Sequence, residues 1–201
     1  MTRLYLVRHG LTDAVGRTLV GRTPGIRLNT EGRAQANAAA AALASASLAA
    51  VISSPLERAT ETAAPIAARH GLPVEVVQEL NEFDVGDWTG SSFADIDRDP
   101  HWRKFNDARS LTPAPGGESM LDVQRRVIDA LLALHRRVNA RAIAVVSHGD
   151  VIRAALVYFL GMPLDLFNRL DVAPAKISIV DLDDHAIVVR QVNGDTAQPA
   201  A

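Results

Sequence analysis

The chain has 201 residues, of which 48% are hydrophobic, and a formal net charge of −2 at pH 7. This length and composition favour one globular domain with a sizeable core, and so small a net charge gives no basic field that would attract nucleic acid or an anionic membrane. The chain contains no cysteine, which excludes disulfides, thiolate metal sites and a cysteine nucleophile. A small solute is therefore the expected partner.

The amino-terminal region and an alanine-rich stretch bear on cellular location. Only four apolar residues, 4–7, precede Arg8, which is too few for the core of a signal peptide. Residues 34–51 are rich in alanine but are interrupted by polar side chains, so they predict a packed helix rather than a membrane span. We expect a cytoplasmic protein.

Strand and helix patterns alternate along the chain. Apolar runs with β-branched residues predict strands at 4–7, 50–52, 74–77, 142–146, 177–180 and 186–192. Helical patterns lie between most of them, over 31–48, 55–70, 119–138 and 151–161. This order predicts the α/β class, with a three-layer α/β/α sandwich around a mostly parallel central sheet.

Three of the predicted helices have a recognisable start. Thr30 is the expected N-cap of the first helix, and Ser119 is the expected N-cap of the third. Ser54 and Glu57 have the spacing of a capping box, with Pro55 at the first position of the second helix.

Residues 81–118 differ from the rest of the chain. Glycine and proline are scattered there among charged and aromatic residues, which predicts a loop-and-short-helix excursion that forms a lid or pocket wall. No internal linker is visible, so we expect a single domain over 1–192 and a flexible tail over 193–201.

Polar side chains follow three of the predicted strands. Residues 8–10 (Arg-His-Gly) follow the first strand, 53–58 follow the second, and 147–149 (Ser-His-Gly) follow the fourth. Because the carboxyl ends of parallel strands meet at one edge of a sheet, these segments should converge there.

The converging groups suit a phosphate. Arginine holds phosphate oxygens in pairs at any relevant pH, and helix N-termini also favour an anion. A neutral imidazole near phosphorus can attack it and carry the phosphoryl group. Neighbouring arginines lower the pKa of that imidazole and so keep it neutral, and a second histidine can stabilise the charge on the transferring group.

Six ordered segments then carry a resemblance to a known family. They are LVRHGLT at 6–12, GRTPGIRLNTEGRAQA at 21–36, SSPLERATETA at 53–63, LNEFDVGDWTG at 80–90, PGGES at 115–119 and VSHGDVIR at 146–153. Together they resemble the histidine phosphatase superfamily, which includes phosphoglycerate mutases and many small phosphatases. The resemblance implies a phosphoglycerate mutase-like fold.

The resemblance also implies residue roles. His9 would be the nucleophile that becomes phosphorylated, and the phosphoryl group would be bound and polarised by Arg8, Arg58 and His148. Glu82 would be the proton donor to the leaving oxygen and then the base that activates water, with Asp84 and Asp87 as rival carboxylates. The further substrate-binding positions are Gly10, Thr12, Gly21, Arg22 and Gly149.

The sequence departs from the family pattern at two positions. An asparagine that often helps to hold the phosphate is replaced by Val15, and Arg17 or Arg22 are the candidates for a replacement donor. The residue before the expected acid is often arginine in relatives and is Asn81 here, which affects the substrate side of the pocket.

Several alternatives stay open at this point. His9 and His148 could be structural, or could bind zinc together with a carboxylate, although the arginines beside them oppose a cation. The favoured function is a phosphomonoesterase of small phosphorylated metabolites that needs no metal or cofactor. A phosphoglycerate mutase and a non-catalytic phospho-ligand-binding module are the alternatives. The substrate and the oligomeric state, including a homodimer, are not decided by the sequence.

Overall fold

The computed structural model describes residues 1–138 and 141–195. The strands of this part are β1 (Thr2–Arg8), β2 (Leu48–Ser53), β3 (Val74–Val76), β4 (Ala142–Ser147), β5 (Ile177–Leu182) and β6 (Ile187–Gly194). The α-helices are α1 (Thr30–Ala42), α2 (Glu57–His70), α3 (Phe93–Ile96), α4 (Pro100–Asp107), α5 (Met120–Val138) and α6 (Gly149–Phe159). Short 3₁₀ helices are formed by Gln78–Leu80, Gly86–Trp88 and Leu164–Arg169.

The strands form one mixed sheet in the order β3-β2-β4-β1-β5-β6. The pairs β3–β2, β2–β4 and β4–β1 are parallel, whereas β5 and β6 are antiparallel additions at one edge. The register places Arg8 opposite Ser147 and Ser53 opposite Val146, so three polar chain segments leave the sheet side by side. The predicted α/β class and mostly parallel sheet are confirmed.

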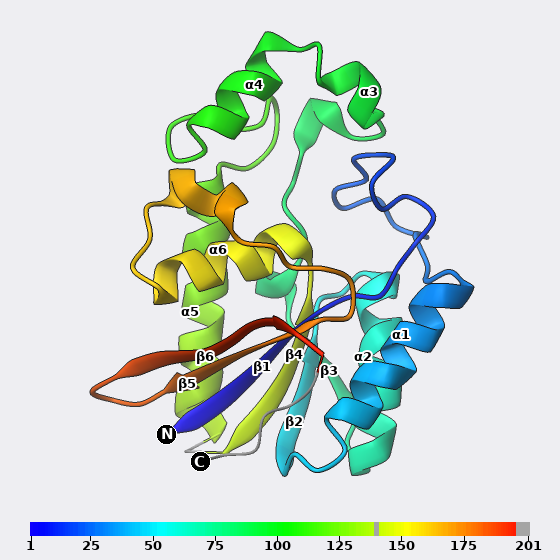
Figure 1. The fold of residues 1–201 in the computed structure, drawn as a ribbon, viewed down its shortest axis with the longest axis vertical. Coiled ribbons are helices and arrows are strands. Elements are labelled where there is room, and N and C mark those ends of the chain that lie inside the picture. Colours follow the sequence, from blue (N-terminus) through cyan, green and yellow to red (C-terminus); the bar gives the residue numbers. More distant parts are fainter. Residues whose placement is uncertain (139–140, 196–201) are drawn as a thin grey trace.

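Helices cover both faces of the sheet (Figure 1). In β1, Leu4 and Leu6 belong to the apolar core on the α5 and α6 side, whereas Tyr5 and Val7 belong to the core on the α1 and α2 side. This alternation is the period of two that a strand buried on both faces requires. Because alternate residues of a strand such as β1 face opposite sides, both faces of the sheet are apolar and need helices to cover them, which gives three layers.

Three helix predictions differ from the structure. Helix α1 ends at Ala42 rather than at 48, because residues from Leu48 onwards pair with β4 as strand β2. Its N-cap is Asn29, whose side chain accepts a 2.8 Å hydrogen bond from Gly32 N, and not Thr30.

The capping box predicted for the second helix is also wrong. Helix α2 begins at Glu57 with Leu56 as a cap residue that makes no side-chain hydrogen bond. The Ser54 hydroxyl instead lies 2.6 Å from Nε2 of His148. In contrast, Ser119 accepts a hydrogen bond from Asp122 N, as an N-cap does, so that prediction is confirmed.

The predicted excursion lies above the carboxyl ends of the strands, where α3 and α4 form the upper part of the view in Figure 1. It is held by an aromatic cluster in which Trp88 contacts Trp102 and Phe105, with ring centroids 5.2 and 5.3 Å apart. Phe105 also stacks on Phe83 at 5.4 Å. These rings give the irregular segment its own small core.

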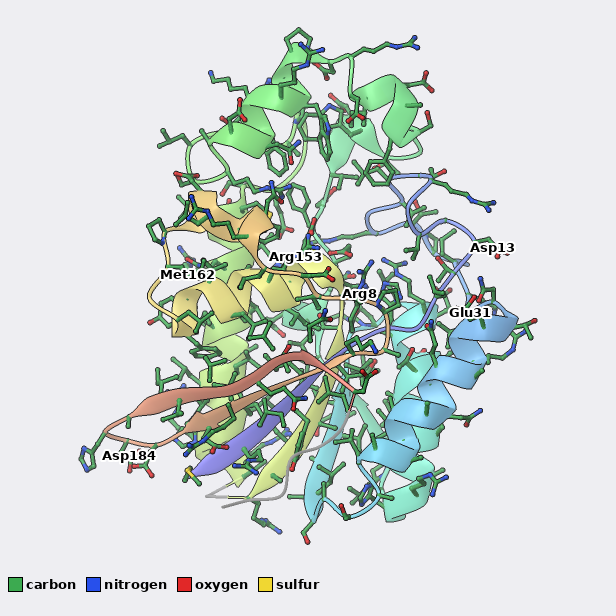
Figure 2. All side chains as sticks on the ribbon, in the orientation of Figure 1. Arg8, Asp13, Glu31, Arg153, Met162 and Asp184 are labelled. Atoms are coloured by element: carbon green, nitrogen blue, oxygen red, sulfur yellow. The ribbon has the colours of Figure 1, made fainter. Side chains whose placement is uncertain are left out.

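Figure 2 shows where this arrangement leaves the charged side chains: Arg8 and Arg153 lie between the sheet and the excursion, and Asp184 lies at the far tip of the β5–β6 hairpin. The hairpin strand β6 includes residues 193 and 194, which the sequence had assigned to a tail; residues 196–201 lie outside the described part. None of the described helices combines the length and the apolarity needed to cross a membrane.

Candidate active site

The two histidines predicted to converge lie next to each other. His9 follows β1 and His148 follows β4, and their ring centroids are 5.3 Å apart at an interplanar angle of 62°. Both side chains are buried, at 4% and 0% exposure. The parallel register of β1 and β4 thus brings together residues that are far apart in the sequence.

The contacts of His9 fix which of its nitrogens is free. Its Nδ1 lies 2.7 Å from the carbonyl oxygen of Gly10. A carbonyl only accepts, so Nδ1 carries the hydrogen and Nε2 holds a lone pair. Burial, reinforced by the charges of Arg58 and Arg8, lowers the pKa of His9 to about 3. At neutral pH the ring is therefore uncharged and the lone pair of Nε2 is available.

His148 is held from the opposite side. Its Nε2 lies 2.6 Å from the Ser54 hydroxyl, which also accepts a long 3.5 Å hydrogen bond from Leu56 N. The Ser54 hydroxyl can donate its hydrogen to Nε2, and in that tautomer the ring hydrogen lies on Nδ1. Burial, followed by the charge of Arg58, lowers the pKa of His148 well below its usual value.

Two guanidinium groups face the same space. Arg58, in the first turn of α2, is 1% exposed and donates through Nη2 to the carbonyl of Gly21 at 2.9 Å. Arg8 donates through Nη1 to the carbonyl of Val172 at 2.6 Å. Each arginine is anchored through one nitrogen, which leaves other N–H groups for a ligand.

Three buried donors in this cluster remain without a hydrogen-bond partner among the described residues. They are Nε of Arg8, Nη1 of Arg58 and Nδ1 of His148. An unpaired buried donor costs on the order of 1–3 kcal/mol. Donors of this kind, together with the N-terminus of α6 that begins directly after His148, match an oxyanion with several acceptor atoms.

Two of the three predicted glycines, Gly149 and Gly21, lie next to these arginines. A Cβ at Gly149 would lie 3.2 Å from Cζ and Nε of Arg8, so the missing side chain lets Arg8 lie against the start of α6. Gly21 has a φ of +47°, a conformation that favours glycine, and its carbonyl anchors Arg58.

Glu82 enters the cluster from the loop after the 3₁₀ helix Gln78–Leu80. Its Oε2 lies 3.7 Å from Nδ1 of His148, and its Oε1 accepts a 2.9 Å hydrogen bond from Phe83 N. Burial, with a smaller contribution from the negative charge of Asp150, raises the pKa of Glu82 to about 7. A carboxyl group with such a pKa can both give and take a proton near neutral pH.

The rival carboxylates occupy other places. Asp84 lies 3.7 Å from Nη1 of Arg22 and its side chain is 42% exposed. Asp87 is exposed on the excursion. Glu82, by comparison, lines the cavity together with His9, and this favours Glu82 as the proton donor.

Two arginines hold the Glu82 segment. The Glu82 carbonyl accepts from Nε of Arg22 at 2.8 Å and from Nη2 of Arg126 at 3.1 Å. Arg126 also donates to the carbonyls of Glu79 and Asn81, and both arginines pair with Glu118. The guanidinium of Arg22, predicted as a substrate contact, is thus directed at the backbone that carries the acid.

The remaining predicted contacts lie around the first loop. Thr12 is 4% exposed and lines the cavity, as does Val15, the position where relatives often have asparagine. Arg17 is exposed. At Val15 the first loop therefore gives the cavity an apolar wall, where the asparagine of relatives would give a hydrogen-bond donor to phosphate.

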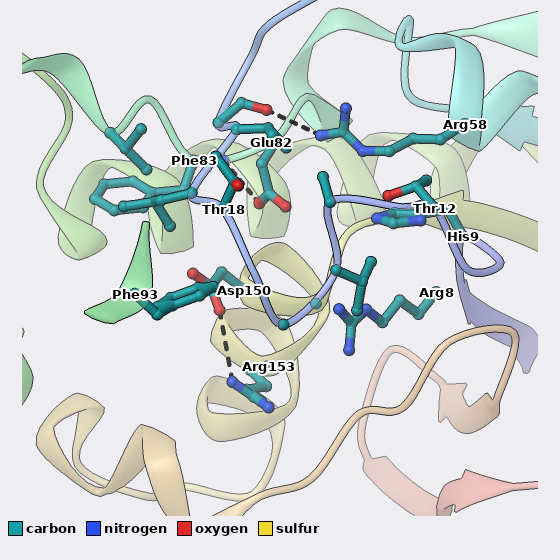
Figure 3. A pocket seen from close by; sticks show the side chains of 18 of the residues that line it. Arg8, His9, Thr12, Thr18, Arg58, Glu82, Phe83, Phe93, Asp150 and Arg153 are labelled. Carbon is teal, nitrogen blue, oxygen red and sulfur yellow. Dashed lines mark hydrogen bonds and ion pairs between the residues drawn. The ribbon is translucent and has the colours of Figure 1, made fainter. Parts of the chain in front are cut away.

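The cavity has a volume of about 250 Å³ and extends beyond the predicted residues (Figure 3). The lining residues that sequence reasoning missed include Leu19, Phe83, Phe93, Trp102, Arg109, Asp150 and Arg153. Most come from the excursion or from the first turns of α6, and no strand-end pattern marked them. Phe83, Asp150 and Arg153 lie inside the quoted motifs but received no role from the sequence, and Arg109 lies outside them.

Metal binding can be weighed on the same geometry. His9, Glu82 and His148 each offer a ligand atom, and these atoms lie within 4.8 Å of one another. However, the guanidinium groups of Arg8 and Arg58 stand beside them, and positive charge opposes a cation. The donor set fits an oxyanion better than a metal ion.

Comparisons with known proteins agree with this arrangement. Residues 4–195 match the family model of the histidine phosphatase superfamily (branch 1). A glucosyl-3-phosphoglycerate phosphatase of Mycobacterium tuberculosis is 36% identical over 172 residues, which cover 81% of this chain and 77% of that protein. A bifunctional protein of the same species is 41% identical over 199 residues and 96% of this chain, but the chain spans only 54% of its length.

Solved structures resemble the whole chain. A phosphoserine phosphatase variant from Entamoeba histolytica in complex with phosphoserine superposes with a TM-score of 0.88 at 27% identity, covering 97% of this chain and 98% of that one.

Proposed function

The chain belongs to the histidine phosphatase superfamily, and from this premise we propose that it hydrolyses phosphomonoesters of small metabolites through a phosphohistidine at His9. The observation that carries the proposal is the cluster of unpartnered buried donors around the free Nε2 of His9. Its relatives named as phosphatases of glucosyl-3-phosphoglycerate and phosphoserine support the substrate class.

In the first step, Arg8, Arg58 and Nδ1–H of His148 hold the phosphoryl oxygens. Nε2 of His9 attacks phosphorus in line, so that an N–P bond forms while the ester P–O bond breaks. Glu82 gives its proton to the leaving oxygen, which departs as an alcohol. The guanidinium groups stabilise the charge that develops on the equatorial oxygens.

In the second step, the Glu82 carboxylate takes a proton from water as the water oxygen attacks phosphorus. The P–N bond breaks, which releases inorganic phosphate and restores neutral His9 and protonated Glu82. A pKa near 7 suits a group that alternates between these states.

The positive charge for this reaction comes from arginine, so the proposed reaction requires no metal or other cofactor. We also propose a cytoplasmic location and no nucleic-acid partner, and the net charge of −2 supports the second of these proposals.

The test is product analysis with purified protein. With 3-phosphoglycerate as substrate, release of inorganic phosphate without 2-phosphoglycerate supports hydrolysis. Appearance of 2-phosphoglycerate would replace the proposal by a mutase. Failure to turn over any of a broad set of phosphoesters, while still binding them, would replace it by a phospho-ligand-binding module.

A further inference from the structure

The cavity has a second end that the proposed chemistry does not use. In Figure 3, Phe93 and Arg153 lie across the cavity from Arg58 and His9. Arg109 lines the same cavity from the loop after α4. Since Arg8 and Arg58 already bind the phosphoryl group in the proposed reaction, Arg109 and Arg153 are available for another part of the substrate.

Arg109 is a buried cation that forms no ion pair with a carboxylate of the described residues, although the charge of Asp150 acts on it from a distance. It is 5% exposed, and its guanidinium carbon lies 4.5 Å from the ring centroids of both Phe105 and Phe167. Nη2 donates to the side-chain oxygen of Asn106 at 2.6 Å. Nε and Nη1 are buried and have no hydrogen-bond partner among the described residues.

Leaving a charged group in this state is unfavourable. Cation–π contacts and one neutral hydrogen bond recover part of the hydration that burial removes, but two donors of a full positive charge stay unsatisfied. Burial accordingly lowers the pKa of Arg109. A ligand oxyanion would satisfy both donors at once, since the guanidinium fork matches a carboxylate or phosphate.

Arg153 adds a second charge at the same place. Its guanidinium carbon is 5.5 Å from the Phe167 ring, and its Nε is also buried without a partner among the described residues. Its contacts to Asp150 and Asp171 are long, at 3.6 and 3.8 Å. Asp150 lines the cavity and offsets part of this positive charge, whereas Asp171 does not line it and its side chain is 75% exposed to solvent.

We infer that Arg109 and Arg153 form a second oxyanion subsite, so that the preferred substrate is a phosphomonoester that carries another acidic group. Phe93 and Trp102, which line the cavity, would contact the carbon skeleton between the two groups. This inference rests on the proposed function for the position of the reacting phosphate. The second acidic group is a carboxylate or a second phosphate, which share the chemistry that this subsite recognises.

The first arm of the test compares matched esters with the wild-type protein. Glycerol 3-phosphate has a hydroxymethyl group where 3-phosphoglycerate has a carboxylate, and glycerol 1,3-bisphosphate has a second phosphate on that group. We expect kcat/KM to be about 10- to 100-fold higher for one or both acidic esters, the range for a hydrogen bond to a charged group. The better ester identifies the acidic group. Equal values for all three would overturn the inference.

The second arm uses variants. Arg109→Met should remove the preference by slowing the acidic ester while changing glycerol 3-phosphate little, and Arg153→Met should act in the same direction. Arg103→Met is the matched control, because Arg103 is exposed on the same excursion. Equal slowing of all esters by Arg109→Met, in a protein with a wild-type circular dichroism spectrum, would count against the subsite. If that variant does not fold, Arg153→Met decides in the same way.

The third arm separates the subsite from the reaction. Binding of the three esters to the His9→Ala variant, measured by isothermal titration calorimetry, needs no turnover. If an acidic ester binds more tightly than glycerol 3-phosphate, and if adding Arg109→Met removes this difference in affinity, the subsite is supported even if the phosphatase function fails. Equal affinities would overturn the subsite even if the protein were an active phosphatase.

Discussion

The two ends of the cavity are built in different ways. At the phosphoryl end, His9 and His148 directly follow β1 and β4, and Arg58 lies in the first turn of α2, which follows β2. The parallel register of these strands fixes where the three segments begin. At the far end, Arg109 comes from the excursion and rests on the rings of Phe105 and Phe167. One end depends on backbone pairing, and the other on side-chain packing.

We propose that this difference separates the reaction from the selection of substrates. A sheet edge holds reacting groups with the accuracy that in-line attack requires, whereas an irregular segment can change its residues without disturbing the sheet. Mutations at the phosphoryl end should therefore affect all esters, and mutations at the far end should affect only some of them.

The largest effect is expected at His9. Replacing His9 by alanine removes the nucleophile, and kcat for every ester should fall by about 10³-fold or more. The control is His185→Ala, because His185 is exposed on the β5–β6 hairpin. Turnover by His9→Ala close to that of the wild type would contradict the assignment of the reaction to the phosphoryl end.

Glu82→Gln should produce the next largest effect, and a selective one. Glutamine cannot give a proton, so esters with poor leaving groups such as glycerol 3-phosphate should slow by about 10²- to 10⁴-fold. p-Nitrophenyl phosphate should slow much less, since nitrophenolate leaves without protonation. Steady-state kinetics on both esters measures the split, and equal slowing would contradict the role of proton donor.

Arg126→Met should have a smaller effect of the same kind. Arg126 holds the backbone of Glu82, and a misplaced acid should reduce kcat for glycerol 3-phosphate by about 10-fold. The loss should again be greater than for p-nitrophenyl phosphate, which a general loss of folded protein would not produce. Arg125→Met is the matched control because Arg125 is exposed on the same helix. A loss that is the same for both esters would indicate a purely structural role.

The smallest expected effect concerns Asp150, which lies between the two ends. Because the first step needs protonated Glu82, kcat/KM for glycerol 3-phosphate should fall as the pH rises through about 7. The Asp150 charge raises the pKa of Glu82, so Asp150→Asn should move this fall to lower pH. A pH–rate profile from 5 to 9 checks both points. A rate that rises through pH 7, or a shift to higher pH, would contradict them.

The sequence predicts the two ends unequally. Apolar β-branched runs such as 4–7 and 142–146 identify the strands, and the polar residues directly after them identify the phosphoryl end. The extent of helix α1 was overestimated because alanine is favourable in a helix, while pairing with β4 draws residues from Leu48 into a strand.

The residues of the far end could not be predicted from strand patterns in the sequence. The excursion was expected to form a pocket wall, but whether Arg109 points into the cavity depends on the packing of Phe105 and Phe167. The contact with Phe167 joins residues more than fifty positions apart, and no periodic pattern in the sequence marks it. The sequence similarly predicts Ser54 as a helix cap, because only the tertiary fold places its hydroxyl against His148.

Rapid-quench trapping tests the central claim most directly. After brief mixing with an ester labelled with ³²P, the protein should carry an acid-labile, base-stable phosphoramidate, and mass spectrometry should place it on His9. Label on His148 or on a carboxylate, or no covalent label while phosphate is released at the normal rate, would contradict the account.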